Sequence, residues 1–108
     1  MRIKIMFSKK LIYVKVYANH CSNALLFQSE DTSIQPRDIV IVSLHGKEVP
    51  AIVVQVSRKI KNKNINLEFI LRKAGFFERN KLSADVHNRV KNEKLAWIDE
   101  IEYWNAMG

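Results

Sequence analysis

The chain has almost no cysteine, and this limits how it can be stabilised. Cys21 is the only cysteine among 108 residues, so an intramolecular disulfide is impossible. A protein without disulfides suits a reducing compartment such as the cytosol. A chain of this length can bury about two thirds of its unfolded surface, which is enough for a core without cross-links. The sequence therefore predicts a single domain over residues 1–108.

A long uninterrupted apolar run is also absent. Residues 1–17 begin with positive charge, as a secretion signal does, but Lys9, Lys10 and Lys15 interrupt the apolar residues there. The apolar stretches are too short to target or span a membrane. We therefore expect a soluble, cytoplasmic protein that has no membrane partner.

Glycine is scarce, with three residues in the chain, and no glycine-rich phosphate-binding pattern is present. No nucleophile motif or carboxylate pair has a spacing that indicates catalysis. An adjacent His20-Cys21 pair with the distant His45 and His87 lacks the spacing of a metal site. We expect a protein that is not an enzyme and that carries neither a metal nor another cofactor.

Positive charge is abundant and unevenly distributed. The formal net charge is +7. Residues 58–81 hold eight basic and two acidic residues, residues 1–57 hold seven and four, and residues 82–108 hold three and five. The basic middle of the chain can attract a polyanion. The alternative is a lysine-rich surface that reflects the compositional bias of the host.

The strongest structural signal is a β-hairpin in the middle of the chain. Two β-prone runs, Ile39–Leu44 and Val49–Val56, are separated by four residues that include Gly46. Both runs are so apolar that both of their faces need cover. Before the hairpin, Pro36 followed by Arg37 favours a type I turn. Further alternating runs predict strands at Arg2–Phe7, Leu11–Tyr17, Ala24–Gln28 and Ile65–Leu71, the last of them pairing with Val49–Val56.

The C-terminal part of the sequence predicts a helix. After a break at Gly75, where Phe76 and Phe77 are expected to pack in the interior, Ser83 can cap a helix. Its apolar residues recur at three- and four-residue spacing: Val86, Val90, Trp97, Ile98, Ile101 and Trp104. We therefore expect a mainly β fold with some α: a small antiparallel β-barrel of five or six strands over residues 1–81, covered by an amphipathic helix over residues 82–108.

Two groups of residues are candidates for binding a nucleic acid. A basic loop followed by a strand is expected to bring six cations together as a phosphate-binding edge: Arg58, Lys59, Lys61, Lys63, Arg72 and Lys73. On one face of the run Leu11–Tyr17, Tyr13 and Tyr17 flank Lys15, a pattern that can stack bases beside a phosphate contact. The alternative for these tyrosines is that a helix or another strand covers them.

Part of the chain resembles a known DNA-binding domain. The resemblance covers residues 13–56 and rests on Leu25-Leu26-Phe27, the run Ile34–Val42, Gly46 and the run Ala51–Val56. These hydrophobic patterns resemble the N-terminal domain of the bacterial replication-restart helicase PriA, which binds DNA 3′ ends. A similar small barrel occurs in polymerase-suppressor-type domains.

The resemblance implies a DNA-binding barrel but transfers no pocket residue. The Phe-Asp-Tyr motif that helps form the family's 3′-end pocket corresponds here to Ala24-Leu25-Leu26, and Arg37 stands in place of the expected turn glycine. The helicase motor is missing as well. The resemblance therefore implies a stand-alone module, encoded by a phage or another mobile element.

Two functions follow as hypotheses. The first is a nucleic-acid-binding module, for DNA in preference to RNA, that acts in DNA replication or at the primosome in replication restart, with replication proteins as further partners. The second is a protein-interaction module, an adaptor or inhibitor, that uses the aromatic and acidic C-terminal helix with Trp97, Tyr103 and Trp104.

Overall fold

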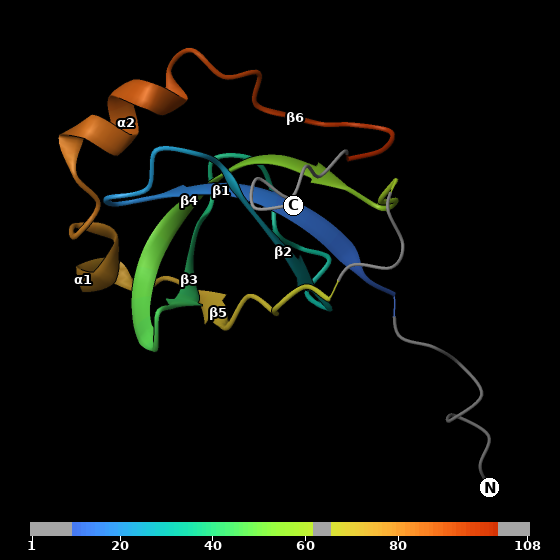
Figure 1. Ribbon diagram of the computed structural model, residues 1–108, viewed down its shortest axis with the longest axis horizontal. Coiled ribbons are helices and arrows are strands. Elements are labelled where there is room, and N and C mark those ends of the chain that lie inside the picture. The colour runs from blue at the N-terminus through green and yellow to red at the C-terminus, as the bar shows by residue number, and fades with distance from the viewer. Residues whose placement is uncertain (1–9, 62–65, 102–108) are drawn as a thin grey trace, which may run out of the picture.

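The computed structural model describes residues 10–61 and 66–101. These residues form one six-stranded sheet with two short helices (Figure 1). The elements are β1 (Ile12–Ala18), β2 (Leu25–Ser29), β3 (Ile39–Leu44), β4 (Lys47–Ser57), β5 (Arg72–Lys73), α1 (Phe76–Arg79), α2 (Ala84–Val90) and β6 (Ala96–Trp97). The prediction of a mainly β fold with some α is confirmed. The predicted strand at Arg2–Phe7 lies outside the described residues.

The central hairpin forms as predicted, with a tighter turn. β3 and β4 pair antiparallel from Ile39↔Ile52 to Leu44↔Lys47. The two residues between them, His45 and Gly46, have φ angles of 54° and 79°. Two positive φ angles in a two-residue loop match the twist of the flanking strands. The longest strand, β4, also pairs with β1, so it lies at the centre of the sheet.

The sheet is not closed into a barrel. Its strand order is β2-β1-β4-β3-β5, and β6 pairs with β4 outside this order. Near the open side, a single bridge joins Gln28 of β2 to Phe69, where Gln28 N–H donates to the Glu68 carbonyl and Ile70 N–H donates to the Gln28 carbonyl. Because two hydrogen bonds do not make a strand ladder, the barrel that the sequence predicts does not close.

The strand predicted over Ile65–Leu71 is wrong as well. Among the described residues of that run, no regular strand forms; the short β5 follows it and pairs with β3 rather than with β4. The reason is that β4 already has β1 on one side, and β3 and β6 on the other. The chain after residue 66 therefore reaches the free side of β3.

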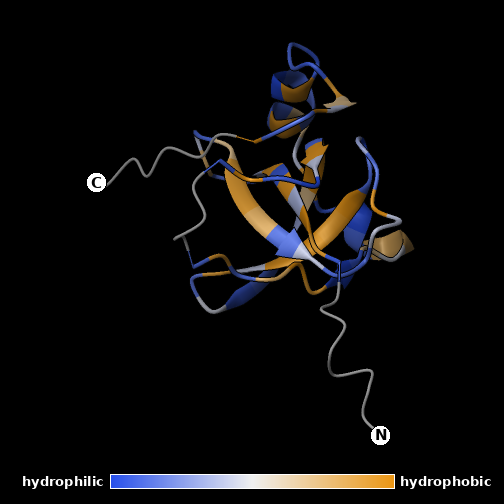
Figure 2. Cartoon of the chain, turned by 90° about the vertical axis from the view of Figure 1, so that its right-hand side faces the viewer, coloured by the Kyte–Doolittle hydropathy of each residue, from blue (hydrophilic) through white to orange (hydrophobic). Residues whose placement is uncertain are grey.

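Both faces of the sheet are covered, as the apolar hairpin requires. Alternate residues of β1 and β4, such as Val14 and Val53, are fully buried in the main core. On the other face Ile52 and Val54 pack against α2 through Val86. Figure 2 shows the hydrophobic colouring concentrated on the strands and the hydrophilic colouring on the loops.

The predicted C-terminal helix is shorter than expected. Ser83 caps α2, and its hydroxyl accepts a hydrogen bond of 3.3 Å from Val86 N–H. The helix ends at Val90, and the chain continues as β6, which pairs parallel to Gln55 and Val56 of β4. The prediction of a helix over Trp97, Ile98 and Ile101 is therefore wrong, because this segment instead pairs with the part of the β4 edge that β3 does not occupy. Trp104 lies outside the described residues.

Two local predictions are also wrong. Arg37 has a φ of 81°, which excludes the predicted type I turn. Arg37 N–H donates to the Val53 carbonyl (2.7 Å), and Val53 N–H donates to the Asp38 carbonyl (2.8 Å), so pairing with β4 fixes the turn. Phe76 and Phe77 are 75% and 80% exposed rather than packed, because α1 contributes no buried residue to the core.

Candidate nucleic-acid interface

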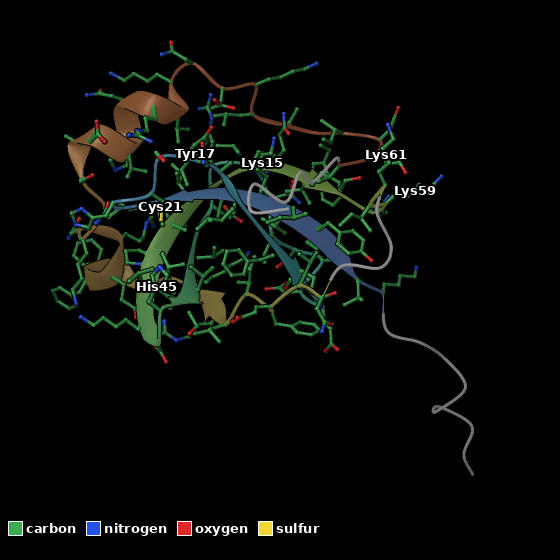
Figure 3. All side chains as sticks on the ribbon, viewed as in Figure 1. Lys15, Tyr17, Cys21, His45, Lys59 and Lys61 are labelled. Atoms are coloured by element: carbon green, nitrogen blue, oxygen red, sulfur yellow. The ribbon has the colours of Figure 1, made fainter. Side chains whose placement is uncertain are left out.

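A basic surface lies where β4 ends. We name it the basic end and define it as Lys10, Arg58, Lys59 and Lys61. Arg58 and Lys59 directly follow β4, and both are exposed. Among the described residues, no carboxylate lies within ion-pairing distance of Arg58 or Lys59. Figure 3 places Lys59 and Lys61 together at this end of the sheet.

Trp97 lies beside Arg58 at the basic end. The guanidinium carbon of Arg58 lies 5.2 Å from the centroid of the Trp97 ring, a cation–π contact. The indole N–H of Trp97 donates to Oε1 of Gln35 at 2.8 Å, which fixes the ring on the other side. Trp97 remains 36% exposed. The structure therefore holds an aromatic ring and a guanidinium together at the surface.

The backbone after β4 is held by the C-terminal segment. The buried Ser57 hydroxyl donates to the Asp99 carbonyl (3.0 Å) and accepts from Lys59 N–H (3.1 Å). Ile101 N–H donates to the Lys59 carbonyl (3.1 Å), and Lys61 N–H donates to the Ile101 carbonyl (3.0 Å). These four bonds fix the direction in which Lys59 and Lys61 leave the sheet.

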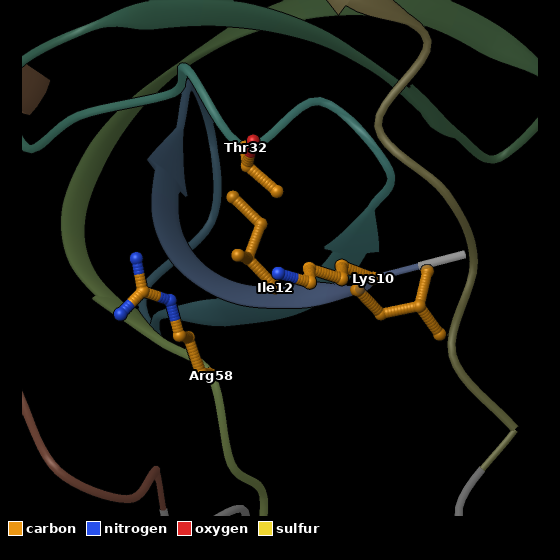
Figure 4. A pocket seen from close by; sticks show the side chains of 5 residues that line it. Lys10, Ile12, Thr32 and Arg58 are labelled. Carbon is orange, nitrogen blue, oxygen red and sulfur yellow. The ribbon is translucent and has the colours of Figure 1, made fainter. Parts of the chain in front are cut away.

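Two pockets meet at Arg58. The larger, about 580 Å³, is lined by Lys10, Leu11, Ile12, Thr32 and Arg58. Figure 4 shows Lys10 and Arg58 entering it from opposite sides, with Ile12 and Thr32 between them. The second pocket, about 260 Å³, is lined by Arg58, Lys59, Trp97, Ile98 and Asp99. Among the described residues that line the two pockets, three are cations and one is a carboxylate, so this described lining carries net positive charge.

Arg72 and Lys73 do not join this surface. Arg72 donates two hydrogen bonds of 2.6 Å to the Glu78 carboxylate and one of 3.3 Å to Glu48. Lys73 Nζ lies 3.7 Å from Oδ2 of Asp38. Hydrogen bonding from Arg72 lowers the pKa of Glu78 to about 2, and the same bond raises the pKa of Arg72. Both predicted phosphate contacts are therefore offset by neighbouring carboxylates.

The two cation groups are also far apart along the sheet. Arg72 contacts Glu48 near the start of β4, and Arg58 follows the end of β4 ten residues later. Ten residues of strand correspond to roughly 33 Å of chain at about 3.3 Å per residue. The single edge expected from the sequence is therefore wrong, because β5 pairs with β3 and not with β4. Lys63 lies outside the described residues.

Tyr13, Lys15 and Tyr17 lie on the outer face of β1, which other segments partly cover. Tyr13 packs against the cluster that contains Ile101, and Tyr17 packs against the α2 cluster. The Tyr17 hydroxyl donates to Oε2 of Glu93 at 3.0 Å. Burial raises the pKa of the Tyr17 phenol, and the Glu93 contact raises it further. The alternative of covered tyrosines describes this face better than an open stacking platform does.

The sequence did not indicate that Trp97 lies beside Arg58. The two residues are far apart in the sequence, and the apolar spacing predicts a helix at Trp97. Only the pairing of β6 with β4 brings them together. In the part of the chain that the structure describes, no three His, Cys, Asp or Glu side chains are grouped to hold a metal ion. Nor does any helix there have the length and apolar character to cross a bilayer.

Comparisons of the chain with models of protein families, with curated proteins and with solved structures found no match.

Proposed function

We propose that this chain is a nucleic-acid-binding module that contacts phosphates through its basic end. The carrying observation is the concave surface at Arg58, where the described lining of the two pockets combines Lys10, Arg58 and Lys59 with the Asp99 carboxylate. Grouped cations attract a polyanion more strongly than dispersed ones. The net charge of +7 adds a long-range attraction of the same sign.

The exposed Trp97 supports a single-stranded nucleic acid as the ligand. Base stacking on an aromatic ring is tolerant of sequence, and a neighbouring arginine adds to it. Trp97 offers a partly exposed ring beside the Arg58 guanidinium. The resemblance to the helicase domain extends this proposal to DNA rather than RNA, to a role in replication or replication restart, and to a phage or mobile-element origin. The composition extends it to a cytoplasmic location.

Fluorescence anisotropy with labelled single-stranded, duplex and forked DNA tests the proposal. We expect binding at low salt, strongest for DNA with a single-stranded part, and weaker binding by the Trp97→Ala variant. Trp97→Phe is the matched control, because it keeps a ring that can stack. If the wild-type protein shows no detectable binding to any of the three DNAs at low salt, the nucleic-acid proposal is wrong.

A second candidate is a protein-interaction module, and the exposed phenylalanine pair favours it. Phe76 and Phe77 form an edge-to-face pair, 5.4 Å between ring centroids, on the exposed helix α1. Exposed aromatic residues are enriched where proteins bind one another. Of the aromatic residues in the predicted C-terminal surface, Trp97 belongs to a strand, and Tyr103 and Trp104 lie outside the described residues, so this candidate is argued from the phenylalanine pair. Replacing both phenylalanines with Ser without any change in self-association or in partner capture would count against this function.

A further inference from the structure

A small pocket away from the basic end is lined by three cations. Its lining residues come from the turn before β3 and the start of β3, from β5 and the residue after it, and from α1: Arg37, Asp38, Ile39, Lys73, Ala74 and Arg79. Its volume is about 140 Å³, well below the roughly 300–1,000 Å³ of pockets that hold drug-sized molecules. A pocket of this size and charge suits a single anionic group.

The positive charge of this pocket is only partly offset. Lys73 lies 3.7 Å from the Asp38 carboxylate, whose Oδ2 also accepts a hydrogen bond from Gln35 N–H (2.9 Å). No carboxylate within the described ranges lies at ion-pairing distance from Arg37 or Arg79. Two guanidinium groups are therefore available to an anion, and each can bind a phosphate through two parallel hydrogen bonds.

The backbone of Arg37 provides an independent observation. Its φ of 81° lies in the region that favours glycine, and the hydrogen bond from its N–H to the Val53 carbonyl holds it there. A side chain at this position costs stability that glycine would not cost. Strained residues cluster at binding sites, where the side chain contributes to function. The chain thus carries an arginine in the lining of the pocket at a position whose backbone glycine would adopt without strain.

A larger groove adjoins the pocket at Arg37. This groove, about 530 Å³, lies between α2 and the sheet, and Arg37 lines it as well as the small pocket. Ile52, Val90 and Leu95 provide apolar lining, and the polar lining includes Lys91, His87 and the Glu93 carboxylate. The volume is within the range of pockets that bind small organic molecules. An anion in the small pocket would thus have an apolar compartment beside it.

We propose that Arg37, Lys73 and Arg79 bind the phosphate of a nucleotide, and that the groove between α2 and the sheet takes its base. The phosphate belongs either to a free nucleotide or to a nucleic-acid strand. This site shares no residue with the basic end. It goes beyond the proposed function, since it assigns a phosphate subsite with a neighbouring base compartment.

Amide NMR spectra recorded during titrations test the site. The probes are adenosine monophosphate, inorganic phosphate, adenosine, and a short single-stranded oligonucleotide without terminal phosphates. We expect the monophosphate to shift the amides of Arg37, Asp38 and Ala74 and those of the groove, and phosphate to shift the first set only. Tighter binding of the oligonucleotide than of the monophosphate assigns the phosphate to a strand, and the reverse assigns it to a free nucleotide. No shift of these amides up to about 10 mM of each probe, tenfold above a dissociation constant of about 1 mM, would overturn the proposal.

Arg37→Gly separates binding from folding. Glycine adopts the observed φ without strain, so the variant is expected to melt at the same or a higher temperature. It should bind the monophosphate about tenfold more weakly, as expected for losing a charged hydrogen-bonding group, and Arg79→Ala should do the same. Lys47→Ala, an exposed charge outside both pockets, is the control and should keep wild-type affinity. Equal affinities of wild type and Arg37→Gly would overturn the assignment.

One further variant distinguishes this site from the basic end. Lys59→Ala/Lys61→Ala should keep the affinity for adenosine monophosphate, because neither lysine lines the pocket or the groove. A loss of affinity for the monophosphate in that variant would overturn the separate site. Loss of DNA binding in the same variant bears only on the proposed function.

Discussion

Arg72 donates a hydrogen bond from each of its two terminal nitrogens to the Glu78 carboxylate, both at 2.6 Å. Oε1 of Glu78 also accepts a hydrogen bond of 2.8 Å from Gly75 N–H, so the same carboxylate closes the start of α1. The pair joins β5 to α1 across six residues. It also explains why Arg72 contributes less to the positive surface than its formal charge indicates.

The acid titration of Glu78 follows from this pair. The hydrogen bond from Arg72 lowers the pKa of Glu78 from 4.5 to about 2. The carboxylate is thus favoured in the folded state, and its stabilisation is complete above about pH 4.5 and lost as the pH falls through about 2. Carbon-detected NMR of the carboxyl group should give this pKa. Arg72→Met should raise it towards 4.5, whereas Lys73→Met, which removes the same charge one residue away, should change it much less.

Glycine is required at one turn and not at another. Gly46 has a φ of 79° and no atom within 4 Å of an added Cβ, so Gly46→Ala costs stability through backbone strain alone. The cost should be about 1 kcal/mol. Gly75 has a φ of −80° and would place a Cβ in ordinary contact with Glu78, so Gly75→Ala should be nearly neutral. Urea denaturation of the two variants measures both values, and equal losses would show that strain at the hairpin is not the cause.

The Ser83 cap of α2 should contribute measurably to the free energy of unfolding. Ser83→Ala removes the hydroxyl that accepts from Val86 N–H, which costs about 1 kcal/mol at a helix N-terminus. For a domain of this size the melting temperature should fall by about 4–8 °C. Ser22→Ala, in an exposed loop, serves as the control. A melting temperature equal to that of the control would mean that packing alone holds α2.

The salt dependence of DNA binding should distinguish the two cation groups. Each phosphate contact contributes about 0.7 to 0.9 to the slope of log affinity against log salt. Lys59→Ala/Lys61→Ala/Lys63→Ala should therefore lower that slope, weaken binding to all sequences alike, and leave the melting temperature nearly unchanged. Arg72→Ala/Lys73→Ala should lower the slope less per charge removed, because carboxylates already offset both cations. Fluorescence anisotropy at several salt concentrations gives both slopes. If the two variants lower the slope equally per charge removed, the basic end contributes no more to phosphate binding than Arg72 and Lys73 do.

The local sequence determined the elements whose structure depends on near neighbours. The run Ile39–Leu44 forms the strand that its β-branched residues predict, and β4 contains the predicted run and extends it to Lys47–Ser57. Ser83 caps a helix because its hydroxyl reaches an amide three residues away. The net charge and its concentration in residues 58–81 are also properties of the sequence alone.

Tertiary structure decided how these elements pair and which charges remain unpaired. The spacing of Trp97, Ile98 and Ile101 suits a helix, but the free edge of β4 supplies backbone partners, so the segment becomes β6 and follows the strand. Arg37 adopts a positive φ because its amide must reach Val53. Arg72 lies beside Glu48 because β5 joins β3, which pairs with β4. Each outcome depends on which residues distant in the chain pair with the same backbone groups or the same charge. A local sequence pattern carries no information about that pairing.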